Sequence, residues 1–196
     1  MSSSPSKTGL LFGSFNPIHS GHLMIASFMA EYTDLDQVWF VVSPHNPLKE
    51  KSSLLADYHR LTMVNLAIED DSRFRSSNIE FKLPQPSYTI DTLTYISEKF
   101  PGKEFVLIAG SDNLPTFHKW KNHEELLRQY HIYLYPRPGT KASPFDQHPS
   151  ITKVDAPLIT LSSSFIRKGI RDGKNMRYFL PEKVWKYAEE MHFYRM

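Results

Sequence analysis

The sequence predicts an α/β protein, a Rossmann-like open, mostly parallel sheet with helices on both faces. Two observations support this prediction. Short apolar runs alternate with segments of helical periodicity along the chain, which is typical of parallel β/α construction. The runs are continuously apolar, as expected of strands that helices cover on both sides. In folds of this kind, ligands bind beyond the carboxyl ends of the strands.

Five segments are predicted to be strands, because each is a run of aliphatic, β-branched or aromatic residues. They cover residues 9–15, 37–42, 104–109, 131–135 and the short run 158–161. The first runs into the turn Gly13-Ser14-Phe15-Asn16-Pro17, and the third is followed by Gly110. Both carboxyl ends are candidate positions for a ligand.

Helices are predicted between these strands. Segment 22–32 has apolar residues at helical spacing, with Ser20 as a possible N-cap. Further helices are expected at 54–68, 91–100 and 123–129, after Ser162, and from Pro181 onward, because proline favours a first helical turn. The stretches 44–53 and 136–149 are predicted to be surface loops.

Length and composition limit the classes of protein that fit. With 196 residues, we expect a disordered, Ser-rich tail at 1–8 and a single domain over 9–196. The absence of cysteine excludes disulfides, thiolate metal sites and a cysteine nucleophile. No apolar run has the length of a signal-peptide core or a membrane span, so we expect a soluble, cytoplasmic protein without a membrane partner.

The charge balance argues against a dedicated nucleic-acid binder. The net charge is +2 and the pI about 8.7, and we find no basic run with interleaved aromatic residues. A mild positive balance suits an enzyme whose substrates are polyanions. The oligomeric state cannot be read from the sequence.

The tetrapeptide His19-x-Gly21-His22 follows the first turn and opens the first predicted helix. A helix N-terminus offers N–H groups and a partial positive charge, which favour a bound anion such as phosphate. Gly21 and Gly13 leave room for a ligand to approach the backbone. Two rival interpretations are a surface histidine pair and a zinc site, but the other histidines show no metal-ligand spacing.

A second element has the same character. Ser162, Ser163 and Ser164 stand where a later helix begins, and Arg167 lies one turn inside it. Hydroxyl and N–H groups at a helix N-terminus can hold phosphate oxygens, and an arginine can add a bidentate contact. An ordinary capped helix is the alternative, and both interpretations can hold together.

Taken together, these motifs resemble the nucleotidyltransferase superfamily, and within it the bacterial nicotinate-nucleotide adenylyltransferases. Intermediate matches support the resemblance, which runs from about residue 9 to 187. They are Arg60-x-x-Met63, Pro86-Ser87-Tyr88-Thr89-x-Asp91-Thr92-Leu93, Gly110-x-Asp112-Asn113 followed by Trp120, and Tyr178-x-Leu180-Pro181.

The resemblance implies adenylyl transfer from ATP to nicotinate mononucleotide in NAD biosynthesis, with Mg²⁺ held mainly by the ATP phosphates. It implies that His19 and His22 contact those phosphates, with His22 nearest the transferring group. Arg167 would hold the β- and γ-phosphates, and Lys49 would neutralise charge between the two substrates. The remaining ATP-binding residues are expected to be Gly13, Ser14, Phe15, Gly21, Gly110, Asp112, Ser163 and Ser164.

The acceptor's pyridine ring is expected beside Tyr88, Thr89 and Trp120, because an indole offers a flat stacking face and Thr89 can bond a carboxylate. Two positions depart from the family pattern, since Asn16 replaces a common aspartate and Leu48 replaces a histidine. Three alternatives stay open: nicotinamide mononucleotide as acceptor, phosphopantetheine as acceptor, and a non-catalytic nucleotide sensor.

Overall fold

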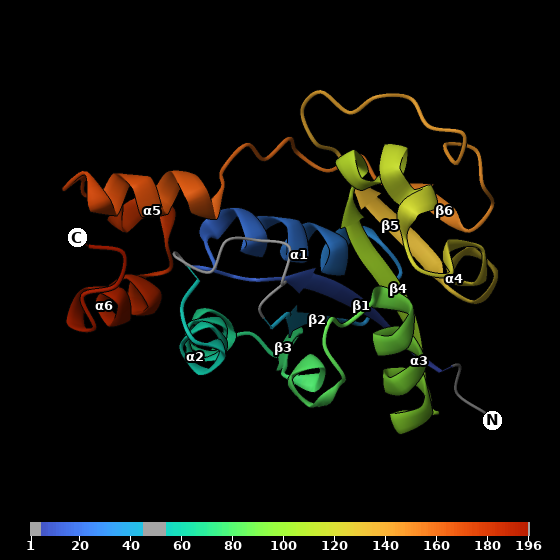
Figure 1. Ribbon diagram of the computed structural model, residues 1–196, viewed down its shortest axis with the longest axis horizontal. Coiled ribbons are helices and arrows are strands. Elements are labelled where there is room, and N and C mark those ends of the chain that lie inside the picture. The colour runs from blue at the N-terminus through green and yellow to red at the C-terminus, as the bar shows by residue number, and fades with distance from the viewer. Residues whose placement is uncertain (1–4, 45–53, 196) are drawn as a thin grey trace.

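The computed structural model describes residues 5–44 and 54–195, and its centre is a parallel sheet in the order β3-β2-β1-β4-β5-β6 (Figure 1). Each neighbouring pair of strands is parallel. The strands are β1 (Ser6–Gly13), β2 (Gln37–Val42), β3 (Phe74–Ser77), β4 (Lys103–Gly110), β5 (His131–Tyr135) and β6 (Ile151–Lys153). The predicted fold class is confirmed.

The strand order reverses between β1 and β4, which are neighbours in the middle of the sheet although two strands separate them in sequence. Their pairing extends to Leu11 opposite Ile108, so both strands end two residues further on, at Gly13 and Gly110. The crevice outside such a reversal is where open α/β sheets bind ligands. The topology therefore brings two of the predicted ligand positions together.

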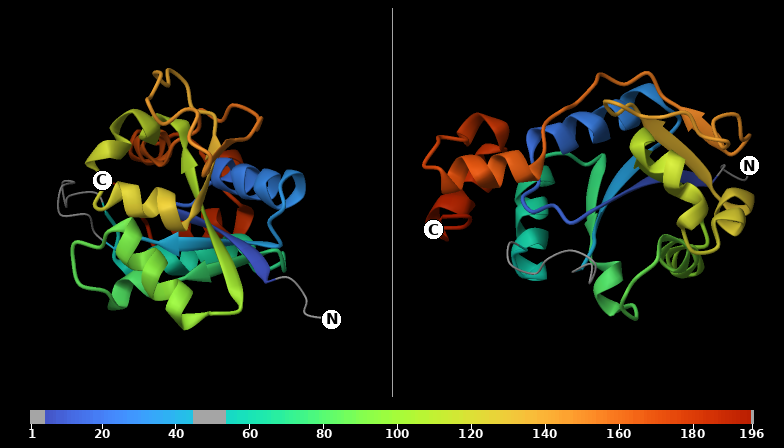
Figure 2. Two further views of the ribbon diagram at one scale, coloured as in Figure 1. Left: turned by 90° about the vertical axis from the view of Figure 1, so that its right-hand side faces the viewer. Right: turned by 45° about the horizontal axis from the view of Figure 1, so that its top comes forward.

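Helices cover both faces of the sheet (Figures 1 and 2). The α-helices are α1 (Ser20–Tyr32), α2 (Asp57–Ile68), α3 (Thr89–Lys99), α4 (His123–Gln129), α5 (Ser163–Arg171) and α6 (Glu182–Glu190). Short 3-10 helices are η2 (Ile79–Lys82), η3 (Ser111–Lys119) and η4 (Arg177–Phe179). Helices α5 and α6 lie at one end of the molecule, and α4 lies at the other.

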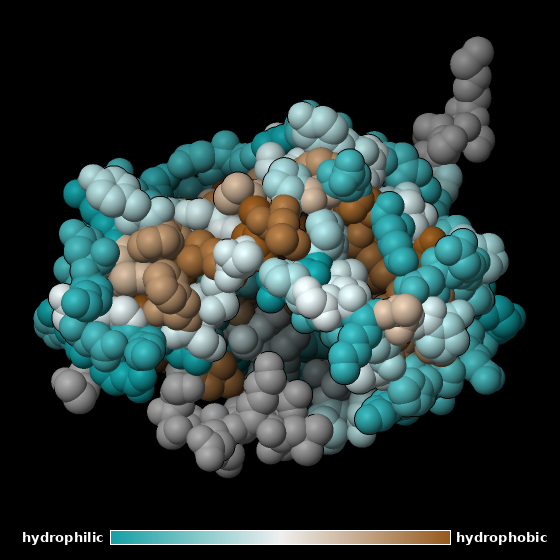
Figure 3. All heavy atoms as spheres, turned by 90° about the horizontal axis from the view of Figure 1, so that it is seen from above, coloured by the Kyte–Doolittle hydropathy of each residue, from teal (hydrophilic) through white to brown (hydrophobic). Residues whose placement is uncertain are grey.

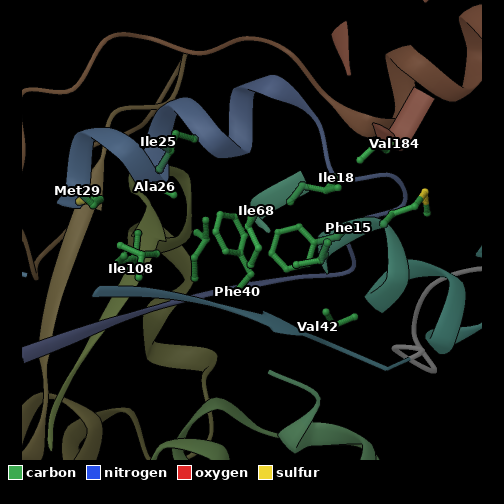
Figure 4. Close-up of a cluster of buried hydrophobic side chains, with 14 of the residues drawn as sticks. Phe15, Ile18, Ile25, Ala26, Met29, Phe40, Val42, Ile68, Ile108 and Val184 are labelled. Atoms are coloured by element: carbon green, nitrogen blue, oxygen red, sulfur yellow. The ribbon is translucent and has the colours of Figure 1, made fainter. Parts of the chain in front are cut away.

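Alternate residues of the strands divide the core into two layers. Leu11, Phe40 and Ile108 pack under α1, α2 and the C-terminal helices, in the layer that Figure 4 shows. Leu10 and Leu107, from adjacent positions, pack against α3 and α4 on the other face. Since both faces are covered, the strands are apolar at consecutive positions.

The structure differs from the predicted strands in one segment that is not a strand and in two strands that were not predicted. Segment 158–161 forms no strand, and Leu158 is exposed, while the carbonyl of Ile159 accepts a hydrogen bond from Arg137 instead of pairing with a strand. Strands β3 and β6 were not expected. They read Phe-Arg-Ser-Ser and Ile-Thr-Lys and form the two edges of the sheet, so they lack a continuous apolar run.

The predicted disordered tail is also too long. Ser6, Lys7 and Thr8 belong to β1 and pair with β4. The Lys7 amide donates to Asp36 at 2.7 Å, and the Lys7 ammonium lies 2.7 Å from the carboxylate of Asp34. Backbone pairing and these two carboxylates hold a segment whose composition alone suggested disorder.

The face in Figure 3 shows hydrophobic side chains in hollows of a mostly hydrophilic surface. One apolar groove of about 300 Å³ runs between α1 and residues 156–159. Ile159 lines this groove and also packs against Gly21 at the start of α1. Among the residues that the structure describes, no helix is long and apolar enough to cross a membrane.

Candidate active site

A buried arginine stabilises the turn after β1 by hydrogen bonds to backbone carbonyls. Arg60 of α2 is 0% exposed, and its guanidinium donates to the carbonyls of Ser14 at 2.6 Å, Ser43 at 2.7 Å and Leu55 at 3.0 Å. It also pairs with the carboxylate of Asp57. One cation thus joins the segments after β1 and β2 to the start of α2, and the buried guanidinium finds the hydrogen-bond acceptors that its burial requires.

Within the turn, Phe15 has a φ of +44°, a left-handed conformation that is uncommon for an aromatic residue. Its buried ring meets His22 edge-on at 5.1 Å and Phe40 at 5.6 Å. A Cβ on Gly13 would lie 2.9 Å from this ring. Gly13 therefore makes room for Phe15, and Phe15 in turn supports the ring of His22.

His19 and His22 stack face to face at the start of α1, with ring centroids 3.7 Å apart and planes inclined by 21°. His19 is the N-cap residue, and its N–H donates to Nδ1 of His22 at 3.2 Å. This bond makes Nδ1 of His22 the acceptor, so that the proton of the neutral ring lies on Nε2. The predicted pair on one side of the helix start is confirmed.

Both imidazoles are held neutral. Burial, together with the guanidinium of Arg137, lowers the pKa of His19 to about 4. Burial, with His19 and Arg137 nearby, also lowers the pKa of His22 well below its ordinary value. His19 is 3% exposed, and no residue in the described part of the chain bonds its Nδ1. An approaching anion would favour protonation of the rings, because opposite charge stabilises the imidazolium form.

Gly21 has a different neighbour from the one expected. A Cβ at this position would lie 2.8 Å from Cγ2 of Ile159 and 3.1 Å from Nδ1 of His19. The position that a Gly21 side chain would take is occupied by these protein side chains, and contact between Gly21 and a triphosphate stays a prediction. Glycine is required here so that α1 can approach the 156–159 segment closely.

The N-terminus of α5 docks onto the same turn. Ser162 caps the helix by accepting from the Phe165 N–H at 3.3 Å. The Ser163 hydroxyl donates to the carbonyl of Pro17 at 2.9 Å, and Arg167 donates to the carbonyl of Asn16 at 2.8 Å. The structure therefore joins the two predicted phosphate-binding elements, although about 140 residues separate them in sequence.

Gly110 and Asp112 lie at the carboxyl end of β4, and the structure adds Arg137 to them. Arg137 follows β5, and its Nε lies 3.9 Å from the carboxylate of Asp112. A Cβ on Gly110 would lie 2.4 Å from Asp112 Oδ1 and 2.9 Å from Cγ of Arg137. A cavity of about 330 Å³ beside them is lined by Ser111, Arg137 and Lys141, among others.

Sequence reasoning missed Arg137, although a signal was present. It stands two residues beyond a predicted strand, at the edge where the other phosphate-binding groups were already expected. The arginine contributes a positive charge that acts on both His19 and His22.

The residues expected at the acceptor's pyridine ring form a more open region. Tyr88 is the N-cap residue of α3 and is 42% exposed, while Thr89 begins the helix. Trp120 is partly buried against Phe117, with ring centroids 5.1 Å apart. The ammonium of Lys121 lies 4.7 Å from the centre of the Tyr88 ring. This contact shows that the segment carrying Trp120 adjoins the N-terminus of α3.

Lys49 and Leu48 lie outside the described residues, as does most of the predicted loop 44–53. Within the described ranges, no group of three histidine, aspartate or glutamate side chains is arranged to hold a metal ion.

With this geometry established, comparison with known proteins identifies the family. The cytidylyltransferase-like family model matches residues 10–169. A relative from Christiangramia forsetii, named a probable nicotinate-nucleotide adenylyltransferase, is 57% identical over 96% of this chain and 98% of its own length. The chain belongs to this family.

Other members agree. A relative of the same name from Bacteroides thetaiotaomicron is 46% identical, covering 94% of this chain and 91% of its own. The structure of the Plasmodium falciparum nicotinic acid mononucleotide adenylyltransferase complexed with NaAD superimposes with a TM-score of 0.79. It is 19% identical over 96% of this chain and 97% of that one, so this likeness concerns the fold. The chain is thus a nucleotidyltransferase of the nicotinate-nucleotide adenylyltransferase group.

Proposed function

We infer that this protein transfers the adenylyl group of ATP to nicotinate mononucleotide, giving nicotinate adenine dinucleotide and pyrophosphate. The observation that carries this proposal is the stacked pair His19 and His22 at the N-terminus of α1, joined to Arg167 of α5 through one turn. The names of the full-length relatives support the choice of acceptor.

In the reaction, a phosphate oxygen of the mononucleotide attacks the α-phosphorus of ATP, and the bond between the α-phosphorus and the bridging oxygen breaks. Pyrophosphate leaves with that electron pair. The attacking phosphate is largely ionised near neutral pH, since its second pKa is about 6, so no general base is needed. Catalysis then consists of positioning two anions in line and stabilising the charge of the leaving group.

We assign His22 and His19 to the transferring and neighbouring phosphates. As neutral rings they act as N–H donors in the free enzyme, and a bound polyanion would favour their protonated forms. Donors that are already in place before the substrate arrives need little reorganisation during the reaction.

We assign the β- and γ-phosphates to the N-terminus of α5. Arg167 bonds Asn16 through one nitrogen and has further N–H groups to offer. The Ser163 hydroxyl is engaged by Pro17, so its contribution would come from its backbone N–H, while Ser164 is exposed. Lys49 stays a prediction for the space between the two substrates. Mg²⁺, held mainly by phosphate oxygens and water, would neutralise part of the charge.

The adenosine is proposed to lie at the carboxyl ends of β4 and β5, where Asp112 could accept from ribose hydroxyls. The pyridine ring is proposed to stack near Trp120. The nicotinate carboxylate would meet N–H groups at the N-terminus of α3, at Thr89, because that end of a helix favours an anion.

The experiment is pyrophosphate release from ATP with nicotinate mononucleotide, nicotinamide mononucleotide and phosphopantetheine compared at equal concentration. We expect the nicotinate compound to give the highest kcat/KM. A higher value with another acceptor would overturn the assignment of the acceptor, and ATP binding without release for any of them would indicate a nucleotide sensor.

A further inference from the structure

The C-terminal segment reaches back to the turn that leads from β1 into the histidine pair. After α6 the chain reverses through His192, at a φ of +54°, and Tyr194, at +63°. The Tyr194 hydroxyl then donates to Oδ1 of Asn16 at 2.9 Å, across 178 positions of sequence. Non-glycine residues hold such conformations where surrounding contacts impose them, and often near functional sites.

Asn16 is the point where several parts of the site meet. Its side chain is 2% exposed, and Oδ1 also accepts from the N–H of Leu55 at 3.3 Å. Its backbone carbonyl accepts from Arg167 at 2.8 Å. Asn16 thereby joins the turn, the segment that leads into α2, and α5.

We propose that Tyr194 is a positioning residue for the ATP half of the site, which it serves by fixing Asn16 and hence Arg167 and the start of α1. The proposal rests on the function inferred above. The Tyr194 ring packs against the main core layer and brings its hydroxyl to the turn. Burial raises the pKa of Tyr194 far above its usual value, so the hydroxyl keeps the proton that it donates.

This arrangement also gives a physical role to Asn16, which replaces the aspartate common in the family. An asparagine oxygen accepts the two bonds from Tyr194 and Leu55 without adding a negative charge beside phosphate-binding groups. A carboxylate in the same buried place would attract Arg167 and oppose an incoming triphosphate.

The test is Tyr194→Phe, which removes the hydroxyl and keeps the ring. Tyr187→Phe is the matched control, because the Tyr187 hydroxyl also makes a partly buried bond from the C-terminal region, at 2.7 Å to His59, which is not a residue of the turn. The affinity for a non-cleavable α,β-methylene analogue of ATP is measured by calorimetry at low temperature. The KM values for ATP and for nicotinate mononucleotide are measured separately.

We expect Tyr194→Phe to weaken binding of the analogue and to raise the KM for ATP by roughly tenfold, as the loss of one partly buried hydrogen bond suggests. The acceptor's KM should stay within about twofold, and Tyr187→Phe should leave both values near those of the wild type. An unchanged affinity, the same loss in Tyr187→Phe, or an equal rise in both KM values would overturn the proposal. Binding of the analogue needs no acceptor, so this result stands even if nicotinate mononucleotide is not the acceptor.

Discussion

The part of the site that we propose for ATP, the ATP half, and the part that we propose for the acceptor, the acceptor half, are built differently. In the ATP half, hydrogen bonds from α2, α5 and the C-terminal segment converge on the turn after β1, and the histidine pair is largely buried. In the acceptor half, Tyr88 and Thr89 stand at the start of α3, where Tyr88 is exposed. Trp120 packs against Phe117, three residues before it in sequence. One half is fixed before substrate arrives, and the other is open to it.

This difference indicates that the triphosphate and the acceptor are recognised in different ways. A triphosphate is a strong anion whose geometry is the same for every nucleotidyltransferase, so a rigid set of donors suits it. Recognition of the acceptor requires a surface that differs between enzymes, and exposed side chains at a helix start can be exchanged without disturbing the core. Changes in the ATP half should therefore affect stability and turnover, and changes in the acceptor half should affect the acceptor's KM.

The largest expected effect is that of Arg60→Met. It leaves the carbonyls of Ser14, Ser43 and Leu55 without their donor, and a polar group left unsatisfied in the interior typically costs about 1–3 kcal/mol. Denaturant unfolding should show this loss, with activity falling as the turn loosens. Arg75→Met, whose guanidinium lies over the Trp39 ring without such bonds, serves as the control. A loss below about 1 kcal/mol would show that the turn does not depend on this arginine.

His22→Ala should reduce kcat by roughly 10²–10³-fold, the typical effect of removing one donor to a developing charge. The fold should survive, because His22 stands at the start of α1 and, unlike His19, is not fully buried. Initial rates of pyrophosphate release measure the effect. His131→Ala provides the comparison, since His131 is exposed at the opposite, amino end of β5. Turnover near that of the wild type would remove His22 from the catalytic residues.

Trp120→Ala is expected to raise the KM for nicotinate mononucleotide by about tenfold, in line with the 1–3 kcal/mol that base–aromatic stacking contributes. The KM for ATP should change little, because Trp120 lies outside the ATP half. Steady-state kinetics with each substrate varied in turn separate the two constants. A change confined to ATP would contradict this placement of the ring.

The smallest effect concerns Glu80, a buried carboxyl beneath α3 whose Oε1 accepts from the Thr92 hydroxyl at 2.7 Å. Burial raises the pKa of Glu80 in the folded state, although the hydroxyls of Thr92, Ser43 and Ser87 oppose the shift. Its contribution to stability is therefore complete below the pKa of the unfolded chain and is lost as pH rises through the folded pKa.

Glu80→Gln removes this titration. Relative to the wild type, we expect the variant's melting temperature to improve as pH rises above about 4, the pKa of an unfolded glutamate, and to level off once the pH exceeds the folded pKa. Thermal melts of both proteins across that range measure the difference, with Glu98→Gln on the exposed side of α3 as baseline. A difference that does not vary with pH would mean that Glu80 titrates alike in both states.

The sequence predicted the parts of the molecule whose signals are local. Continuous apolar runs marked β1, β2, β4 and β5, and the histidine and serine motifs marked the starts of α1 and α5. The edge strands β3 and β6 were not predicted. An edge strand pairs with a neighbour on one side only, and its residues can be polar. Segment 158–161 looked like a strand by composition, but pairing depends on which neighbours the fold supplies.

Contacts between distant segments could not be foreseen in the same way. Nothing near Arg60 in the sequence shows that its guanidinium would meet three carbonyls, and nothing near Tyr194 points to Asn16. The packing beside Gly13 and Gly21 was likewise not foreseen, because the side chains that a Cβ would meet there come from Phe15 and Ile159. A motif identifies which atoms are present at a site, whereas packing decides what surrounds them.

The bond between Tyr194 and Asn16 also bears on how the protein is made. Its two ends are separated by 178 positions, and at about 5–20 residues per second a ribosome needs roughly 10–35 s to add that much chain. During synthesis the turn before the histidine pair therefore emerges early. Its hydrogen bond to Tyr194 can form only when the end of the chain has been made. A nascent chain that stalls before Tyr194 could complete its sheet and still lack the contact that fixes the ATP half.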